Sequence, residues 1–121
     1  MDLYACVENE TVVKSGETVK IPTGIAIAIP DGYVALIFAR SGLSIKNGLA
    51  PANCVGVVDS DYRGEIIVGL HNHSKQDYTV KQNERIAQLV IMRLPDIKIE
   101  EVKELDETVR GADGFGSTGK M

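Results

Sequence analysis

The sequence lacks tryptophan, and aromatic residues make up only 5% of its 121 residues. It also lacks any run of lysine or arginine, and its 17 acidic and 13 basic residues give a net charge of −4. Nucleic-acid-binding proteins usually present a concentrated basic face, so we expect no nucleic acid as a partner. Four scattered arginines could still converge on one small anion: Arg40, Arg63, Arg85 and Arg110.

Long apolar stretches are missing too, and none approaches the length of a membrane-spanning helix. Met1 is followed at once by Asp2, without the basic and apolar regions of a secretory signal. The two cysteines, Cys6 and Cys54, form neither a metal-binding spacing nor a disulfide framework. We therefore expect no membrane partner and a reducing, cytoplasmic location, or the interior of a host cell if a phage encodes the chain.

Strand-like segments recur roughly every eight to twelve residues with turn signals between them, which is typical of an all-β sandwich or barrel. The length favours one domain. The clearest apolar alternation is residues 25–29, whose isoleucines we expect to face the core. The segments expected as strands are 3–8, 19–21, 25–29, 33–40, 54–58, 65–72, 77–81, 85–93 and 97–102.

Residues 41–46 break the strand pattern and favour one helical turn with Ser41 as its cap. Arg40 stands directly before this turn, at the end of an apolar strand. Free backbone amides beside a guanidinium would make an anion site. A capped turn with a surface arginine explains the same residues equally well.

The most distinctive segment is residues 57–69, in which two acids and a tyrosine interrupt an apolar run. Turn formers stand in its middle and β-branched residues on both sides, which predicts a hairpin. Such a tip could hold Asp59 as a water-activating base beside the ring of Tyr62. For the acids alone, a solvated turn is the simpler interpretation.

From about Asp106 the sequence has no packing pattern, and it contains both G-x-G-x-x-G and the beginning of a Walker A loop. Both motifs need a helix directly after the glycines, and none follows here, so we reject both. Hydroxyls, backbone amides and Arg110 would still suit a phosphate chain, and Phe115 could cover something flat. The alternative is a plain flexible terminus.

Two further polar features have structural alternatives. His71 and His73 would share one face of a strand, but no third ligand lies near them, so a solvated strand end is the better interpretation. Gln88 interrupts an apolar run, and a buried glutamine needs partners for its amide. It either serves the structure or lines a site.

Five segments in this order resemble the five motifs of the homotrimeric dUTPase family. They are residues 2–5 (DLYA), 40–43 (RSGL), 56–64 (GVVDSDYRG), 85–89 (RIAQL) and 110–119 (RGADGFGSTG). The resemblance covers most of the chain. It implies a jelly-roll-like β domain over residues 1–105 and a flexible glycine-rich arm over residues 106–121. It also implies a homotrimer whose subunits share active sites, and hydrolysis of dUTP to dUMP and pyrophosphate with Mg²⁺.

The resemblance further implies roles for single residues. Asp59 would activate the water that attacks the α-phosphorus, and Tyr62 would pack on the deoxyribose. Asp2 would meet Mg²⁺ through water, and Phe115 would stack on uracil. The other residues implied in substrate binding are Arg40, Ser41, Gly42, Asn53, Gly56, Val58, Gln88, Arg110, Gly116, Ser117 and Thr118.

Some features depart from the family pattern. An N-terminal strand usually precedes the first motif, Ala39 replaces a common proline, and Asp113 stands where glycine is usual and adds negative charge to the arm. Two other functions compete with dUTP hydrolysis. A dCTP deaminase would share the fold but needs a further acid at the base, which we do not identify. A nucleotide-responsive regulatory protein would be supported by an inserted domain, which the chain lacks.

Overall fold

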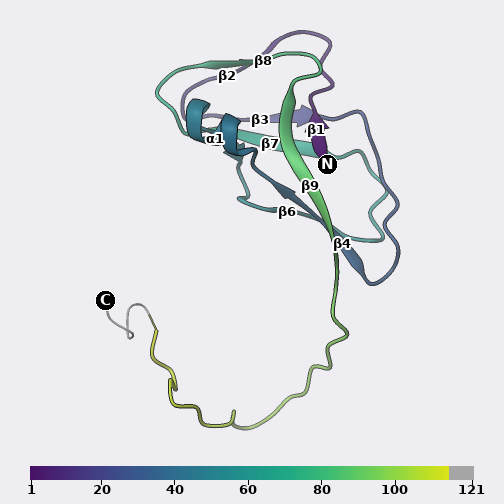
Figure 1. The fold of residues 1–121 in the computed structure, drawn as a ribbon, viewed down its shortest axis with the longest axis vertical. Helices are drawn as coiled ribbons and strands as arrows, with labels where there is room; N and C mark the ends of the chain where they lie inside the picture. Colours follow the sequence, from purple (N-terminus) through teal and green to yellow (C-terminus); the bar gives the residue numbers. More distant parts are fainter. Residues whose placement is uncertain (115–121) are drawn as a thin grey trace.

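The computed structural model describes residues 1–114, which form β-strands and one short helix at the side of the strands (Figure 1). The strands are β1 (Asp2–Tyr4), β2 (Thr11–Val13), β3 (Thr18–Pro22), β4 (Tyr33–Phe38), β5 (Leu49–Pro51), β6 (Gly56–Val58), β7 (Ile67–Asn72), β8 (Tyr78–Val80) and β9 (Arg85–Arg93). The helix α1 (Ser41–Asn47) lies between β4 and β5.

Antiparallel pairing joins the strands into two main sheets and one two-stranded ribbon. One sheet has the order β1-β9-β4-β6, the other has the order β3-β7-β5, and β2 pairs with β8. A single apolar cluster unites Leu89 of β9 with Val68 and Leu70 of β7, so the two sheets share one core. The all-β, jelly-roll-like prediction is confirmed.

The strand β9 shows how the sequence pattern places side chains. Its bounds agree with the predicted ones, and its first half buries Ile86 and Leu89 in the core. Gln88 is exposed, because it lies on the opposite face of the strand from its buried neighbours Ala87 and Leu89. Gln88 is therefore not a core residue, although the apolar run around it suggested a buried setting. The second half of β9 is apolar but about half exposed at Ile91 and Met92.

Two predicted strands are absent from the described chain. Residues 25–29 form no strand, although Ile29 is buried as expected. The segment makes a single ladder-like bond, from the Ile66 amide to the Ile25 carbonyl at 2.9 Å. The expected edge strand at residues 97–102 is also wrong, since Ile97 and Ile99 are exposed and meet no sheet. Alternation specifies a face, but a strand also needs a neighbour.

Short strands were the ones missed. The pattern did not predict β2 or β5, each of three residues. The first predicted strand is cut to Asp2–Tyr4, where the register with β9 shifts after Leu3. Three residues carry too little alternation to be recognised without their partners.

The helix α1 follows β4 as predicted, but Ser41 does not cap it. Arg40 occupies the N-cap position without a side-chain capping bond, and Ser41 is the first helical residue. At the other end Gly48 takes the left-handed conformation, with φ of 73°, and its amide donates to the Ser44 carbonyl at 2.9 Å. Glycine suits this position because a left-handed C-terminal residue disfavours a side chain.

After β9 the described chain forms no further strand. Figure 1 shows this segment leading away from the sheets. Among residues 1–114, no helix has the length and apolar character needed to cross a membrane.

Candidate active site

The segment that carries Asp59 and Tyr62 connects two sheets. It leaves β6, which pairs with β4, and enters β7, which pairs with β3 and β5. The predicted hairpin is therefore wrong, because β6 and β7 do not pair. The turn itself is present, with the Tyr62 amide donating to the Asp59 carbonyl at 3.2 Å. Turn-forming residues bend the chain both in a hairpin and in a connection between two sheets, so the local sequence could not distinguish these two arrangements.

A cavity of about 240 Å³ opens beside this turn. Five of the residues predicted to act on or bind substrate line it together: Asn53, Gly56, Val58, Asp59 and Tyr62. Sequence reasoning missed the remaining lining residues, which are Ile37, Val57, Glu65, Ile66 and Ile67. Strand β4 supplies Ile37 through its pairing with Gly56, and that long-range register left no local signal.

One wall of the cavity is formed where β6 pairs with β4. A Cβ on Gly56 would lie 3.1 Å from the Cβ of Ile37 and 3.5 Å from the side-chain nitrogen of Asn53. A side chain at position 56 would therefore crowd Ile37, while its Cβ would be in ordinary contact with Asn53. The Asn53 amide offers one acceptor and two donors beside this wall, which suits a flat ring with polar edges.

The ring of Tyr62 is fixed at its far end. Its hydroxyl donates to the backbone carbonyl of Glu65 at 3.0 Å, and 46% of the residue remains exposed. The Glu65 carboxylate in turn accepts a bond from the Gly24 amide at 2.8 Å. Tyr62 therefore presents a held, accessible aromatic surface at the same cavity as the exposed carboxylate of Asp59.

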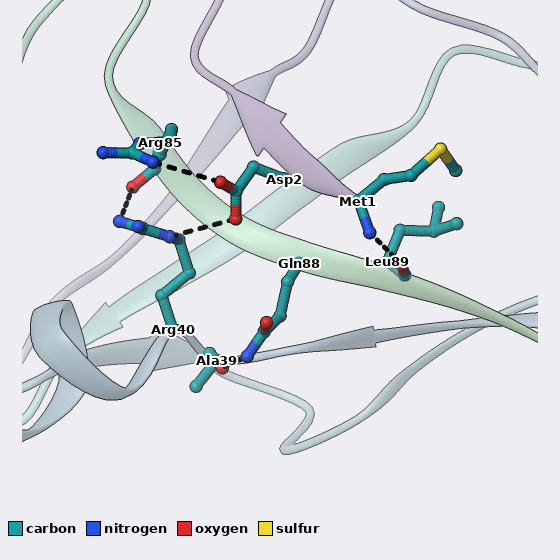
Figure 2. Close-up of polar contacts among 7 residues, drawn as sticks. All are labelled: Met1, Asp2, Ala39, Arg40, Arg85, Gln88 and Leu89. Carbon is teal, nitrogen blue, oxygen red and sulfur yellow. Dashed lines mark hydrogen bonds and ion pairs between the residues drawn. The ribbon is translucent and has the colours of Figure 1, made fainter.

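A second group of predicted residues gathers around Asp2 (Figure 2). The Arg40 Nε lies 3.2 Å from one Asp2 oxygen, and an Arg85 terminal nitrogen lies 3.4 Å from the other. Arg40 also donates to the Arg85 carbonyl at 3.3 Å. Nearby, the Gln88 amide donates to the Ala39 carbonyl at 2.8 Å. The carboxylate thus draws together the ends of β1, β4 and β9.

Arg40 and Arg85 also line a second cavity, of about 430 Å³, together with Gly42 at the beginning of α1. Lys46 adds a third cation to this lining. Such a group of cations suits the oxygens of a phosphate chain. The two cavities have no lining residue in common, so within one subunit the predicted site is divided between two places.

Tyr78 and Glu84 also line the second cavity, and the Tyr78 hydroxyl donates to the Glu84 carboxylate. Burial, with this hydrogen bond and the negative charge of Glu84, raises the pKa of Tyr78 to about 12. The phenol therefore stays neutral at physiological pH. Sequence reasoning gave no sign of this pair.

The four scattered arginines converge only in part. Arg63 turns back on its own loop and donates to the carbonyls of Ser60 and Tyr62. Arg110 lies beyond β9, where its Nε donates to the Asp113 carbonyl at 3.0 Å. The predicted arm residues Phe115, Gly116, Ser117 and Thr118 lie outside the described residues.

Metal-ligating side chains do not cluster in the described part of the chain. Residues 1–114 contain no group of three or more histidine, cysteine or acidic residues able to hold an ion. The rings of His71 and His73 meet edge to face with centroids 4.3 Å apart, and the His71 Nδ1 lies 2.8 Å from the Thr18 hydroxyl. Each Asp2 oxygen faces one arginine and keeps lone-pair capacity for a water. The residues therefore fit a metal held by other oxygens and contacted through water.

Comparison with known families shows to which family the chain belongs. The family model described as dUTPase matches residues 1–119. The chain belongs to the dUTPase family. It is 50% identical over 119 residues to the deoxyuridine 5′-triphosphate nucleotidohydrolase of Finegoldia magna, which covers 98% of this chain and 83% of that protein. The Rickettsia felis protein of the same name is also 50% identical, over 98% of this chain and 80% of its own length.

Solved dUTPase structures share the fold of this family member. A Staphylococcus bacteriophage 80alpha dUTPase mutant with dUpNHpp superposes with a TM-score of 0.85 at 27% identity, covering 98% of this chain and 84% of that one. The dUTPase from Streptococcus mutans superposes with a TM-score of 0.73 at 32% identity. This match covers 80% of this chain and 79% of that one. Metal dependence is a property of the family.

Proposed function

We propose that this dUTPase-family chain hydrolyses dUTP to dUMP and pyrophosphate. The observation that carries the proposal is that Asn53, Asp59 and Tyr62 line one cavity. An amide, a carboxylate and an aromatic ring would there face the base, the reacting water and the sugar of one deoxynucleotide. In the cell this reaction would limit uracil in DNA and supply dUMP for dTMP synthesis.

Asp59 is the general base of the proposed mechanism. Its carboxylate orients a water and takes its proton as the water oxygen attacks the α-phosphorus in line. The new bond forms between this oxygen and the α-phosphorus, and the bond to the oxygen bridging the α- and β-phosphorus breaks. Pyrophosphate leaves with the electron pair of that bond. The exposed position of Asp59 at the cavity leaves room for a water beside it.

Substrate choice follows from the shape of the same cavity. The ring of Tyr62 packs on the deoxyribose and leaves no room for a 2′-hydroxyl. The wall formed by Gly56 and Val58 keeps the base pocket narrow, which excludes the methyl group of thymine. Asn53 presents an amide to the polar edge of uracil, and cytosine offers the wrong pattern of donors and acceptors to this edge.

Arg40, Ser41, Gly42 and Gln88 bind phosphate in this proposal. Residues 106–121 act as an arm beyond the β domain of residues 1–105, and Arg110, Phe115, Gly116, Ser117 and Thr118 close over the substrate. Two features support a homotrimer with shared sites. The base and phosphate residues line separate cavities of one chain, and the segment after β9 leads away from both sheets (Figure 1).

Mg²⁺ is the proposed metal, held mainly by phosphate oxygens and water, with Asp2 contacting it through a water. When bound, it would align the triphosphate and offset the charge that develops on it. The chain's own contribution is the arginine pair that fixes the Asp2 carboxylate. We propose a cytoplasmic location for the enzyme, as expected for a protein that acts on free nucleotides.

The test is pyrophosphate release in the presence of Mg²⁺, comparing dUTP with UTP, dTTP and dCTP at equal concentrations. Release from dUTP alone supports the proposal and the assigned cavity. Deamination of dCTP would instead favour the deaminase alternative. Binding of dUTP without turnover by folded protein would favour a regulatory protein.

A further inference from the structure

Gly64 lies directly against the ring of Tyr62. A Cβ placed on Gly64 would come within 2.4 Å of the Tyr62 hydroxyl oxygen, 2.6 Å of Cζ and 3.0 Å of Cε2. Van der Waals contact between such atoms needs roughly 3.5 Å or more. All three of these nearest atoms belong to Tyr62, so no side chain fits at position 64 unless this ring moves.

The backbone does not explain the glycine. Gly64 is absent from the glycines with positive φ, which are Gly16, Gly24, Gly32, Gly48 and Gly111 in the described chain. An alanine would therefore meet no left-handed strain at position 64. The ring of Tyr62 is the feature that requires a missing side chain there.

Other contacts hold the ring against Gly64. The Tyr62 hydroxyl passes over the glycine to donate to the Glu65 carbonyl at 3.0 Å. On the backbone side, Arg63 donates to the carbonyls of Ser60 at 2.6 Å and Tyr62 at 3.0 Å, which fixes the turn. A tyrosine has only two side-chain torsions, so a ring displaced by a methyl group must give up the bond to Glu65.

We propose that Gly64 is a specificity-determining positioning residue, which sets where the Tyr62 ring stands over the sugar of the substrate. The inference rests on the proposed dUTP hydrolysis and deepens it. Gly64 touches no substrate itself. Because Gly64 has no side chain, the Tyr62 ring can lie against the backbone of residue 64 and keep its bond to the Glu65 carbonyl. In this position the ring excludes a 2′-hydroxyl.

The first experiment compares kcat/KM for dUTP and UTP in the wild type, Gly64→Ala and Gly69→Ala. The displaced ring in Gly64→Ala should lose its contact with deoxyribose and leave room for ribose, so the dUTP preference should fall by about tenfold or more. Gly69 is the matched control, because a Cβ added there would lie 3.9 Å from the nearest heavy atom, which is an ordinary van der Waals contact. A general loss of folded protein would lower the apparent kcat/KM for dUTP and for UTP by the same factor, so their ratio would not change. An unchanged ratio in Gly64→Ala would overturn the proposal.

A double-mutant cycle keeps the inference testable should Gly64→Ala be poorly folded. In the Tyr62→Ala background the ring is gone, so Gly64→Ala should then cost little further thermal stability or activity. Equal costs of Gly64→Ala in both backgrounds would show that the glycine serves something other than the ring. The unfolding measurement needs no substrate. If the wild type releases no pyrophosphate from dUTP, the proposed function fails, while the cycle still decides whether Gly64 positions Tyr62.

Discussion

Asp2 and Arg40 form an ion pair, with 3.2 Å between Asp2 Oδ1 and Arg40 Nε, that ties the first strand to the beginning of α1. Arg85 approaches the other Asp2 oxygen at 3.4 Å, and both guanidinium groups line the second cavity. The Asp2 carboxylate therefore positions the guanidinium groups of Arg40 and Arg85. An acid that holds two arginines in place acts on phosphate binding even without touching phosphate.

Asp2→Asn should raise the KM for dUTP on the order of tenfold while changing kcat less, because the arginines lose the charge that orients them. Stability should fall by less than about 1 kcal/mol, since the pair is partly exposed. Steady-state kinetics and thermal unfolding check both. Glu10→Gln is the matched control, because it breaks an exposed pair of Glu10 with Lys81 and should leave KM unchanged. A shift confined to the Mg²⁺ concentration needed for activity would assign Asp2 to the metal alone.

Asp59→Asn should lower kcat by about two to four orders of magnitude, because it removes the base and keeps the shape of the side chain. Binding of a non-hydrolysable dUTP analogue should persist, which calorimetry can measure. Asp61→Asn is the matched control, since Asp61 shares the turn but does not line the cavity. Turnover at the wild-type rate in Asp59→Asn would remove Asp59 from the mechanism.

Some of this arrangement could be predicted from the sequence because it is local. The bounds of β9 follow from one apolar run that ends at Arg93. Asp59 and Tyr62 are three positions apart in one turn, so any fold that keeps the turn keeps them close.

Other features depend on long-range pairing that no local pattern encodes. The alternation at residues 25–29 indicated a strand, but no neighbouring strand pairs with it among the described residues 1–114. The approach of Arg85 to Asp2 depends on the register of β1 against β9, in which Asp2 lies opposite Gln88. Turn chemistry predicted a bend after β6, and only the pairing of β6 with β4 shows that it links two sheets.

Deleting residues 110–121 should lower the turnover of dUTP at least tenfold while the fold and the proposed trimer persist, because every described strand ends by Arg93. Circular dichroism and light scattering check fold and mass, and pyrophosphate release checks activity. Within the full chain, Arg110→Ala should reproduce part of the loss, with Lys103→Ala as a matched control. Loss of the assembled species on truncation would show that the segment is structural.

Tyr78 makes stability depend on alkaline pH. Its pKa of about 12 in the folded chain lies above the ordinary value of 10.0, because burial and then Glu84 disfavour the phenolate. The folded state therefore holds this proton more tightly than the unfolded state. Its contribution to stability is complete below pH 10 and is lost as the pH rises toward 12.

Tyr78→Phe should accordingly flatten the decline of unfolding stability between pH 10 and 12 relative to the wild type. Denaturant unfolding at a series of pH values measures this slope, and the difference between the two proteins cancels the lysines that titrate in the same range. Tyr33→Phe, at an exposed tyrosine, serves as the matched control. Parallel slopes for the wild type and Tyr78→Phe would show that the Tyr78 phenol, despite its bond to Glu84, ionises equally in both states.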